Sequence, residues 1–484
     1  MSGSYLKGLP GLLAATALTV SLALPGTAWA ATPARQGTNR EAELEARLAR
    51  LEVEMAEMQT ALQQARAERS SAKAADGDAA LAVARSAEAK AEAATGRIAA
   101  LEAQPQPQPQ PDGFKVGGTT WKMGGFVKVV GSATRFGNGE LAGGSLGKEF
   151  FLPQQIPVGG AASTDLIGHA RQTRLFFSTS TPLGGKELKG HVEFDFALAA
   201  APLGAQRSTN AYTPTFRRGF ISYGNLLIGQ EWTTFQNAAH LPETTDFVGP
   251  MEGSIFVRQM MVQYRQPLGS GLDLYLAAEN PQTETLTTTS AAMVDNDQDR
   301  MPDLVAKLAF KDKTKELHVA GLVRSVSVHS AGAGDNALGY GATVGGRILF
   351  GPDLRHDFRF VASAGRGIGR YFAVGFAPDA LYDRAVADRL NLVSNVAGWA
   401  SVKLGWTERL RSTFMVGYQH ADYPDSLPVP GLANVEAWSV AGNLFYSPVR
   451  NLDFGIEYRH AVRQVASGLV GKMDRLEMAA KYTF

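Results

Sequence analysis

Hydrophobic and polar residues alternate in short segments from Phe114 to the end of the chain. Between positions 188 and 196, Leu, Gly, Val and two Phe residues interleave with Lys, His, Glu and Asp. Segments 452–459 and 475–484 alternate in the same way. Because successive side chains of a β-strand point to opposite faces, each segment predicts a strand with one apolar and one charged face.

The whole region 114–484 predicts sixteen antiparallel strands joined by connections of two kinds. The strands are expected at 124–135, 170–181, 186–197, 215–223, 225–234, 255–265, 271–279, 303–311, 316–327, 337–350, 356–366, 397–407, 411–419, 436–447, 452–460 and 474–484. Every second connection is short, such as Gly224, whereas the others are long, such as 136–169 and 367–396. Short turns at one rim and long loops at the other are typical of an outer-membrane β-barrel. A secreted propeller or solenoid is the alternative, but we find no internal repeat that favours one.

The first thirty residues predict a secretory signal peptide. Lys7 precedes an apolar run at 11–24, and Ala28 and Ala30 flank Trp29 as a cleavage site. The apolar run is shorter than the roughly 20 residues that a spanning helix needs, and no later segment reaches that length. If the chain spans a membrane without helices, a closed β-barrel is the structure in which every backbone N–H and C=O group can form a hydrogen bond. We therefore expect an all-β transmembrane barrel in the outer membrane of a Gram-negative cell, with its apolar faces toward lipid.

Residues 31–104 predict a helical stalk in front of the barrel. Apolar residues recur at alternating spacings of four and three from Leu44 to Ala65, and the pattern resumes from Ala80 to Leu101. A solitary amphipathic helix is the alternative, but so narrow a seam favours self-association with other copies of the chain. Prolines and glutamines alternate in the linker 105–113, which predicts an extended spacer. We expect the stalk to stand in the periplasm.

Composition and charge narrow the possible functions. The chain has no cysteine, which excludes disulfides, thiol catalysis and thiolate zinc sites. Its net charge of +1 gives no field that would attract nucleic acid. Its eight histidines are scattered without metal spacing, and no serine, histidine and acid group stands out. We expect neither a cofactor nor an enzyme; a barrel hydrolase is an alternative without support in the sequence.

Arginines in the predicted strands are candidates for lining the pore. By the alternation, Gln172 and Arg174 share one polar face, whereas Arg217 and Arg218 are expected to point to opposite faces, so that at most one lines the pore. Arginines across a water-filled lumen can hold a carboxylate weakly enough to release it. Pairing with nearby acids as lumen scaffolding is the alternative for each of them. The complete candidate set is Arg171, Gln172, Arg174, Arg217, Arg218, Arg258, Gln259, Lys307 and Arg324.

The connection 235–254 is a candidate constriction loop. It contains His240, Glu243 and Asp246, and as the third long loop it is expected to fold inward, where its acids would balance the arginines.

Four spaced aspartates form a weak candidate for a calcium site. Asp295, Asp297, Asp299 and Asp303 have a spacing that can wrap a hard cation, although Arg300 stands where such loops have glycine. A solvated acidic loop is the default interpretation.

The barrel region resembles the DcaP-like outer-membrane porins. The resemblance is most specific in 169–182 (HARQTRLFFSTSTP), 190–196 (GHVEFDF), 216–232 (ending LLIGQEW), 242–259 (PETTDFVGPMEGSIFVRQ) and 301–307 (MPDLVAK). It implies a trimer of sixteen-stranded barrels with N-terminal coiled coils that imports dicarboxylates and related small anions. For the lumen it implies a role for Arg171, Gln172, Arg174, Arg217, Arg258 and Gln259. Phosphate-selective and sugar-specific porins are weaker matches.

These expectations combine into a passive diffusion channel for small anionic solutes. The C-terminal Phe484, on a strand that also ends with Tyr482, resembles the signal read by the machinery that inserts barrels into the outer membrane. Outer-membrane lipid, further copies of the chain and small anions are therefore the expected partners. A structural tether, with the barrel as the anchor of the stalk, is the other function that stays open.

Overall fold

The computed structural model describes residues 113–197, 211–296, 299–330 and 333–484. The predicted signal peptide, the predicted stalk and residues 105–112 of the predicted linker lie outside the described residues. The described residues belong to one compact unit, residues 109–484. None of the helices described in it is long and apolar enough to cross a membrane.

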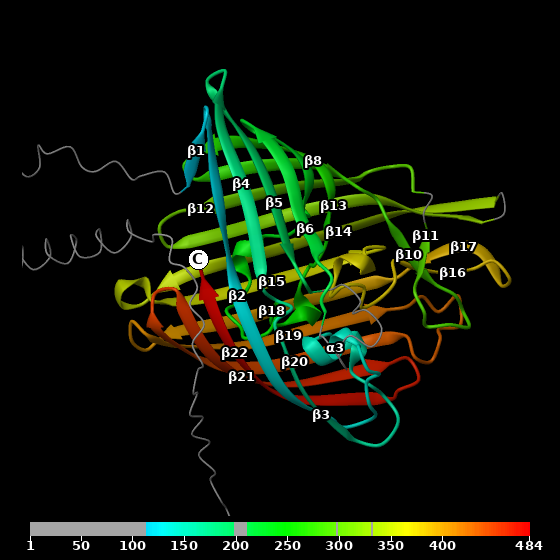
Figure 1. Ribbon diagram of the computed structural model, residues 1–484. Helices are drawn as coiled ribbons and strands as arrows, with labels where there is room; N and C mark the ends of the chain where they lie inside the picture. The colour runs from blue at the N-terminus through cyan, green and yellow to red at the C-terminus, as the bar shows by residue number, and fades with distance from the viewer. Residues whose placement is uncertain (1–112, 198–210, 297–298, 331–332) are drawn as a thin grey trace, which may run out of the picture. The chain divides into compact units, whose positions relative to one another are not determined.

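A closed antiparallel β-barrel makes up this unit (Figure 1). Its strands are β2 (Thr119–Phe136), β3 (Ser163–His169), β4 (Arg174–Leu183), β5 (Lys186–Asp195), β6 (Thr215–Tyr223), β7 (Leu226–Trp232), β8 (Arg258–Gly269), β9 (Leu272–Glu279), β12 (Asp303–Lys311), β13 (Lys315–Ser330), β14 (Ala333–Phe350), β15 (His356–Arg366), β18 (Ser394–Gly405), β19 (Leu410–Asp422), β20 (Asn434–Val449), β21 (Leu452–Val465) and β22 (Val470–Thr483). Since β3 and β4 together fill one position, the barrel has sixteen strands, and the predicted sixteen-stranded antiparallel barrel is confirmed.

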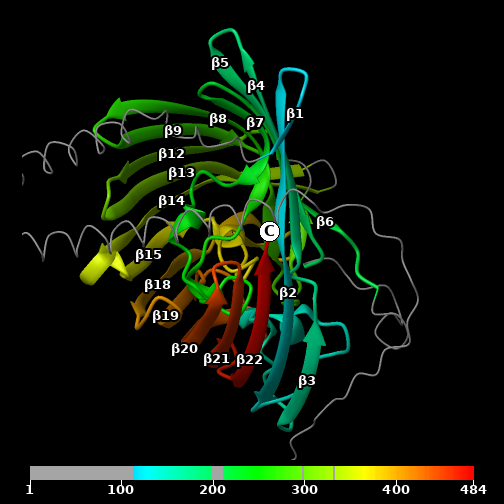
Figure 2. The ribbon, with the colours of Figure 1, turned by 60° about the vertical axis from the view of Figure 1, so that its left-hand side comes forward.

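The first and last strands close the barrel. β2 pairs with β22 from Phe126 opposite Thr483 to Phe136 opposite Met473. Figure 2 shows the two strands side by side, β2 in blue and β22 in red. Beyond the C-terminal end of β22, the short strand β1 (Phe114–Val116) pairs with the same edge of β2 at residues 119–121. The described chain therefore enters the barrel beside the C-terminal Phe484, at the rim that carries the short turns.

The position beside β2 is filled by two strands with a break between them. β3 pairs with residues 130–136 of β2, and β4 pairs with residues 120–126. Residues 170–173 bulge between them, where the Lys128 N–H donates to the Thr173 hydroxyl. Because of this break, Arg171 and Gln172 are both buried, which simple alternation along one strand would not allow.

Burial confirms the alternation along the strands. On β22, Leu476, Met478 and Tyr482 are exposed on the outer face, whereas Arg475 and Glu477 are buried inside. Outward residues are thus apolar over most of the wall, and charged residues point inward.

Long loops carry structure of their own inside and above the barrel. Loop 137–162 contains α3 (Leu146–Glu149) and η1 (Pro153–Gln155), and loop 233–257 contains η2 (Ala238–His240) and η3 (Met251–Gly253). Loop 280–302 supplies β10 (Thr283–Leu286) and β11 (Val294–Asn296) to a separate four-stranded sheet. Loop 367–393 begins with η5 (Gly369–Tyr371) and adds β16 (Ala380–Asp383) and β17 (Ala387–Leu392) to that sheet. A further turn, η4 (Pro352–Leu354), lies at the short-turn rim.

Three of these loops pack a hydrophobic core inside the ring of strands. Phe150 and Phe151 come from loop 137–162, Val248 and Met251 from loop 233–257, and Phe376 from loop 367–393. All of them are almost fully buried. Apolar side chains therefore occupy part of the space inside the barrel.

Candidate functional site

A cavity of about 240 Å³ lies between loop 233–257 and the barrel wall. Its lining from the loop includes Glu243 and Asp246, and its lining from the wall includes Gln172 and Arg174. The structure thus brings together predicted residues that are about 70 positions apart in the sequence. Further lining residues are Phe126, Lys128, Pro242, Thr244, Phe247, Phe445, Asp453, Ala479 and Lys481.

The cations of the cavity are only loosely paired. The Lys128 ammonium donates to the Gln172 side-chain oxygen at 2.6 Å and to the Asp246 carbonyl at 3.0 Å, neither of which is charged. Arg174 lies 3.5 Å from Asp195, and its buried Nε has no hydrogen-bond partner among the described residues. Lys481 is 38% exposed and lies 3.3 Å from Asp453. Such amino and guanidinium groups remain able to contact an anion.

The acids of the same cavity are held by partners in the protein. Glu243 accepts hydrogen bonds from Nε and Nη2 of Arg411, with distances of 2.7 to 2.9 Å. Arg411 also reaches Asp453 at 3.0 Å. Both oxygens of Asp246 accept the Phe151 N–H at 3.2 Å. The lining carries three cations and three carboxylates, and Arg411, bound to Glu243 and Asp453 just outside the lining, adds a fourth cation and so gives a positive bias.

Loop 233–257 is held against the wall at several further points. Lys307 donates to the Gln236 carbonyl at 3.1 Å, and Arg359 donates to the carbonyl of Leu241. Gly253 lies so close to β18 that a Cβ there would sit 2.2 Å from the Gly398 carbonyl oxygen. The loop is thus fixed by barrel cations along its length.

His240 fastens the middle of this loop to β13. Its Nε2 lies 3.1 Å from the Asn237 amide nitrogen, which can only donate, so Nδ1 carries the proton and donates to His318 Nδ1 at 3.1 Å. Burial lowers the pKa of His240 to about 4, so that its ring is neutral at neutral pH. His240 therefore stabilises the loop without adding charge to the lumen.

The expectation that Arg217 and Arg218 point to opposite faces is wrong. Arg217 Nε donates to Glu193 at 2.8 Å, and Arg218 Nη1 donates to the same carboxylate at 3.4 Å. The register of β5 and β6 shifts at this point, so that Glu193 pairs with Arg218 and Phe194 pairs with Phe216. Arg217 is the extra residue of a β-bulge, which turns both arginines to one face.

Most of the other predicted arginines are paired within the protein. Arg171 donates to both oxygens of Glu149 at 2.6 Å, and Arg217 also reaches Asp195 at 2.5 Å. Arg258 lies over the Trp232 ring, 5.2 Å from its centre, and its buried Nη1 has no hydrogen-bond partner within the described ranges.

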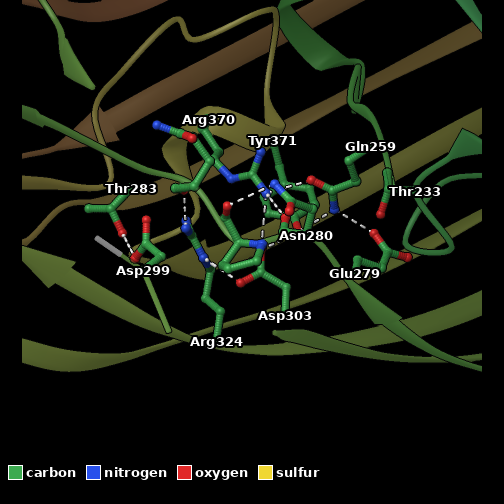
Figure 3. A network of polar contacts seen from close by, with 12 residues as sticks. Thr233, Gln259, Glu279, Asn280, Thr283, Asp299, Asp303, Arg324, Arg370 and Tyr371 are labelled. Atoms are coloured by element: carbon green, nitrogen blue, oxygen red, sulfur yellow. Dashed lines mark hydrogen bonds and ion pairs between the residues drawn. The ribbon is translucent and has the colours of Figure 1, made fainter. Parts of the chain in front are cut away.

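Arg324 and Gln259 belong to a separate buried network beneath loop 367–393 (Figure 3). Arg324 pairs with Asp303 at 3.2 Å and with Asp379 at 2.9 Å. The Gln259 amide donates to Glu279 at 2.6 Å, and its oxygen accepts from Arg370 at 2.6 Å. The structure therefore brings Gln172 and Arg174 to the cavity and Gln259 and Arg324 to this network, and it places the other predicted cations outside both.

Two of the four predicted calcium ligands, Asp299 and Asp303, have partners within the protein. Asp297 lies outside the described residues, and Asp299 accepts a hydrogen bond from Thr283 at 2.7 Å. Asp303 is fully buried and is bound by Arg324, Arg370 and Tyr371. Across the described part of the chain, no group of three or more His, Cys, Asp or Glu side chains could hold a metal ion.

The sequence prediction missed the two lysines of the cavity. Lys128 stands between Val127 and Val129, and Lys481 shares the polar face of the last strand, so the alternation carried a signal for both. The sequence contains no signal for Arg411 on β19, because its contact with Glu243 depends on the fold placing β19 beside loop 233–257.

Comparison with known proteins places the chain in a family. Residues 155–484 match the family model of the DcaP outer membrane protein, which is more than half of the chain. The chain belongs to this family. Membership makes it an outer-membrane channel protein and accounts for the barrel with its outward apolar faces. None of the curated proteins matches the chain in sequence.

Solved structures agree with the membership in the DcaP family. The outer membrane channel DcaP of Acinetobacter baumannii is 26% identical with a TM-score of 0.63, over 77% of this chain and 99% of that one. OmpT of Vibrio cholerae in its trimer form is 10% identical with a TM-score of 0.48, over 76% and 100%. OmpF of Salmonella typhi is 12% identical with a TM-score of 0.46, over 76% and 98%. The last two add nothing to what the family already shows.

Proposed function

We propose that this DcaP-family chain is a passive diffusion channel for small anionic solutes, with dicarboxylates as the preferred class. The observation that carries the proposal is the imbalance of the 240 Å³ cavity. Glu243 is bound by Arg411, which lies outside the lining, whereas Lys128 donates to neutral oxygens and the buried Nε of Arg174 has no hydrogen-bond partner among the described residues. A passing carboxylate can replace these weak contacts and leave again, because no contact in the cavity is strong enough to trap it.

The separation of the cations supports anions with more than one carboxylate. Lys128, Arg174 and Lys481 come from three different strands around one cavity. A solute with two carboxylates can contact two of them at once, whereas a sugar gains nothing from the charges. The resemblance to dicarboxylate-importing porins points in the same direction.

Orientation and assembly follow from the same proposal. The short-turn rim, where the described chain enters beside Phe484, faces the periplasm, so that residues 31–104 form a periplasmic stalk. Three copies assemble in the membrane, joined in part by the stalk. Deletion of residues 31–111 distinguishes a channel from a structural tether. A channel should still conduct ions after the deletion, whereas a protein that acts only as a tether should lose its function.

Reversal potentials of the purified, full-length chain in asymmetric KCl test the proposal. The unmodified channel should prefer chloride, and Lys128→Gln or Arg174→Gln should weaken that preference. Lys313→Gln is the matched control, because Lys313 is an exposed cation of a short turn. Succinate should reduce the chloride current more than acetate or glucose does. A cation preference, or an equal effect of Lys313→Gln, would overturn the proposal.

A further inference from the structure

Loop 233–257, which lines the cavity, is supported by contacts with a second loop, 367–393. Residues 254–257, its last part, lie against residues 371–373 of loop 367–393. Ile255 and Phe372 form an isolated antiparallel bridge. The Phe256 N–H donates to the Tyr371 carbonyl at 2.9 Å, and the Ala373 N–H donates to the Ser254 carbonyl at 3.0 Å. Two loops that are over 100 residues apart are thus joined by backbone hydrogen bonds inside the barrel.

Side chains strengthen this junction. Tyr371 is fully buried, and its ring packs edge-on against Phe235 with the ring centres 5.9 Å apart. Ile255, Phe235, Phe372 and Tyr371 belong to one hydrophobic cluster. Both ends of loop 233–257 therefore contact Tyr371 of the other loop.

The other loop is in turn fixed to the wall by the buried network of Figure 3. Arg370 donates to Asp303 at 3.1 Å and to Gln259 at 2.6 Å, and the Tyr371 hydroxyl donates to Asp303 at 2.7 Å. Asp379 binds Arg324 at 2.9 Å and accepts the Arg370 N–H at 3.1 Å. Such buried ion pairs have few alternative arrangements, because every partner would otherwise remain unpaired away from water.

The network also reaches loop 233–257 directly. Gln259 donates to Glu279 at 2.6 Å, and the other oxygen of Glu279 accepts the Thr234 N–H at 2.7 Å. Thr234 is where the loop leaves β7, and Ser254 is where it meets Ala373. The network therefore holds the beginning of the loop through the bond from Thr234 to Glu279, and loop 367–393 holds its end through the bond from Ala373 to Ser254.

We infer that residues 367–379, which we name the strut, position the constriction loop, and that Arg370 and Tyr371 are positioning residues for conduction although neither lines the cavity. Neither residue is part of the cavity lining. The inference rests on the proposed function in one respect: it assumes that loop 233–257 forms the part of the channel that limits the ion current. It makes no statement about the sign of the charge that the channel prefers.

A cysteine pair tests the junction without any measurement of current. The natural chain has no cysteine, so Ile255→Cys with Phe372→Cys introduces one defined pair at the bridge. The pair should form a disulfide on mild oxidation of the folded, full-length protein. It should form more slowly when Arg370→Gln is added, because the strut is then less well placed. A folded barrel in which the pair does not cross-link would overturn the inference.

Single-channel recording tests the effect on conduction. Arg370→Gln should raise open-channel noise and add conductance levels, and Tyr371→Phe, which keeps the ring but removes the bond to Asp303, should do so more weakly. Arg366→Gln is the control, because Arg366 is an exposed arginine at the end of β15. Equal behaviour of Arg370→Gln and Arg366→Gln would contradict the inference.

Rescue separates positioning from a general loss of stability. In the chain that carries Arg370→Gln and both cysteines, oxidation should restore quiet, single-level openings, and reduction should abolish them again. Heat-modifiable migration on gels checks that each variant is a folded barrel. Noise that oxidation leaves unchanged would show that the strut does not act through the bridge. A cation-selective channel with this rescue would overturn the proposed function but not the strut.

Discussion

Arg217 and Arg218 are consecutive residues of β6, and both bind the carboxylate of Glu193. A regular strand cannot place neighbouring side chains on one face, and the bulge opposite Glu193 and Phe194 makes it possible. Glu193 is buried, and Arg174 lies 3.8 Å from it as a third cation. One carboxylate thus holds together a cluster of positive charge on the wall beside the cavity.

We expect Glu193→Gln to destabilise the barrel by about 1.5 to 3 kcal/mol, because it removes the charge of a buried carboxylate from its bonds to Arg217 and Arg218, while Arg217 keeps Asp195 and Arg218 keeps Glu231 as partners. Urea unfolding in micelles, followed by tryptophan fluorescence, measures this change. Glu187→Gln is the control, since Glu187 on the same strand is half exposed and pairs with exposed Lys189, where such a pair contributes about 1 kcal/mol or less. Equal losses from the two substitutions would show that Glu193 does not organise the cluster.

The strands were predictable because their pattern has a simple physical cause. Lipid outside and polar groups inside impose a two-residue period that can be read from the sequence, as on β22 from Leu476 to Tyr482. Bulges break the period without a sequence signal of their own. The two-residue period therefore predicts opposite faces for Arg217 and Arg218, whereas the bulge brings both to Glu193.

The interior was much less predictable than the wall. Phe151, Met251 and Phe376 come from three distant inward loops and pack into one cluster. The local sequence around each of them does not indicate which of the other residues it contacts. The same holds for Arg411, whose role depends on Glu243 lying opposite it. Asp303 begins β12, as the predicted strand 303–311 has it, but its partner Arg324 could not be predicted from the sequence. Long-range pairing of this kind requires the three-dimensional structure.

Arg411→Gln should reduce the preference for anions, because it leaves Glu243 as an unneutralised negative charge in the cavity. The side chains are joined by three contacts of 2.7 to 2.9 Å. Reversal potentials of the two single variants and of the double variant with Glu243→Gln measure the coupling between them. The double variant should recover most of the preference. If Arg411→Gln has the same effect with and without Glu243, the two residues act independently.

The sheet above the barrel should be more stable at pH 6 than at pH 8. Burial, with the nearby charge of Asp379, raises the pKa of Glu284 from 4.5 to about 7. The folded sheet thus binds a proton more tightly than the unfolded segment, so the stabilisation is complete below about pH 4.5 and is lost as the pH rises through 7. We expect a difference of roughly 1 to 3 kcal/mol in local opening over the whole window.

Hydrogen exchange of residues 283–286 measures this opening after correction for the intrinsic effect of pH. Glu284→Gln removes the titrating group and should make the opening free energy independent of pH between 6 and 8. An unchanged pH dependence in that variant would assign the effect to another group.

Substitution by arginine should affect stability and conductance differently at two adjacent residues of β22. Met478 is 55% exposed on the outer face, whereas Ala479 is 9% exposed and lines the cavity. Met478→Arg places a charge against lipid and should cost about 2 to 4 kcal/mol if it lies near the midplane. Ala479→Arg directs the same group into the cavity, so it should cost less stability while it narrows the passage and lowers the single-channel conductance. Urea unfolding and bilayer recording of both variants give the two readouts, and a larger loss of stability for Ala479→Arg than for Met478→Arg would contradict the assignment of inner and outer faces.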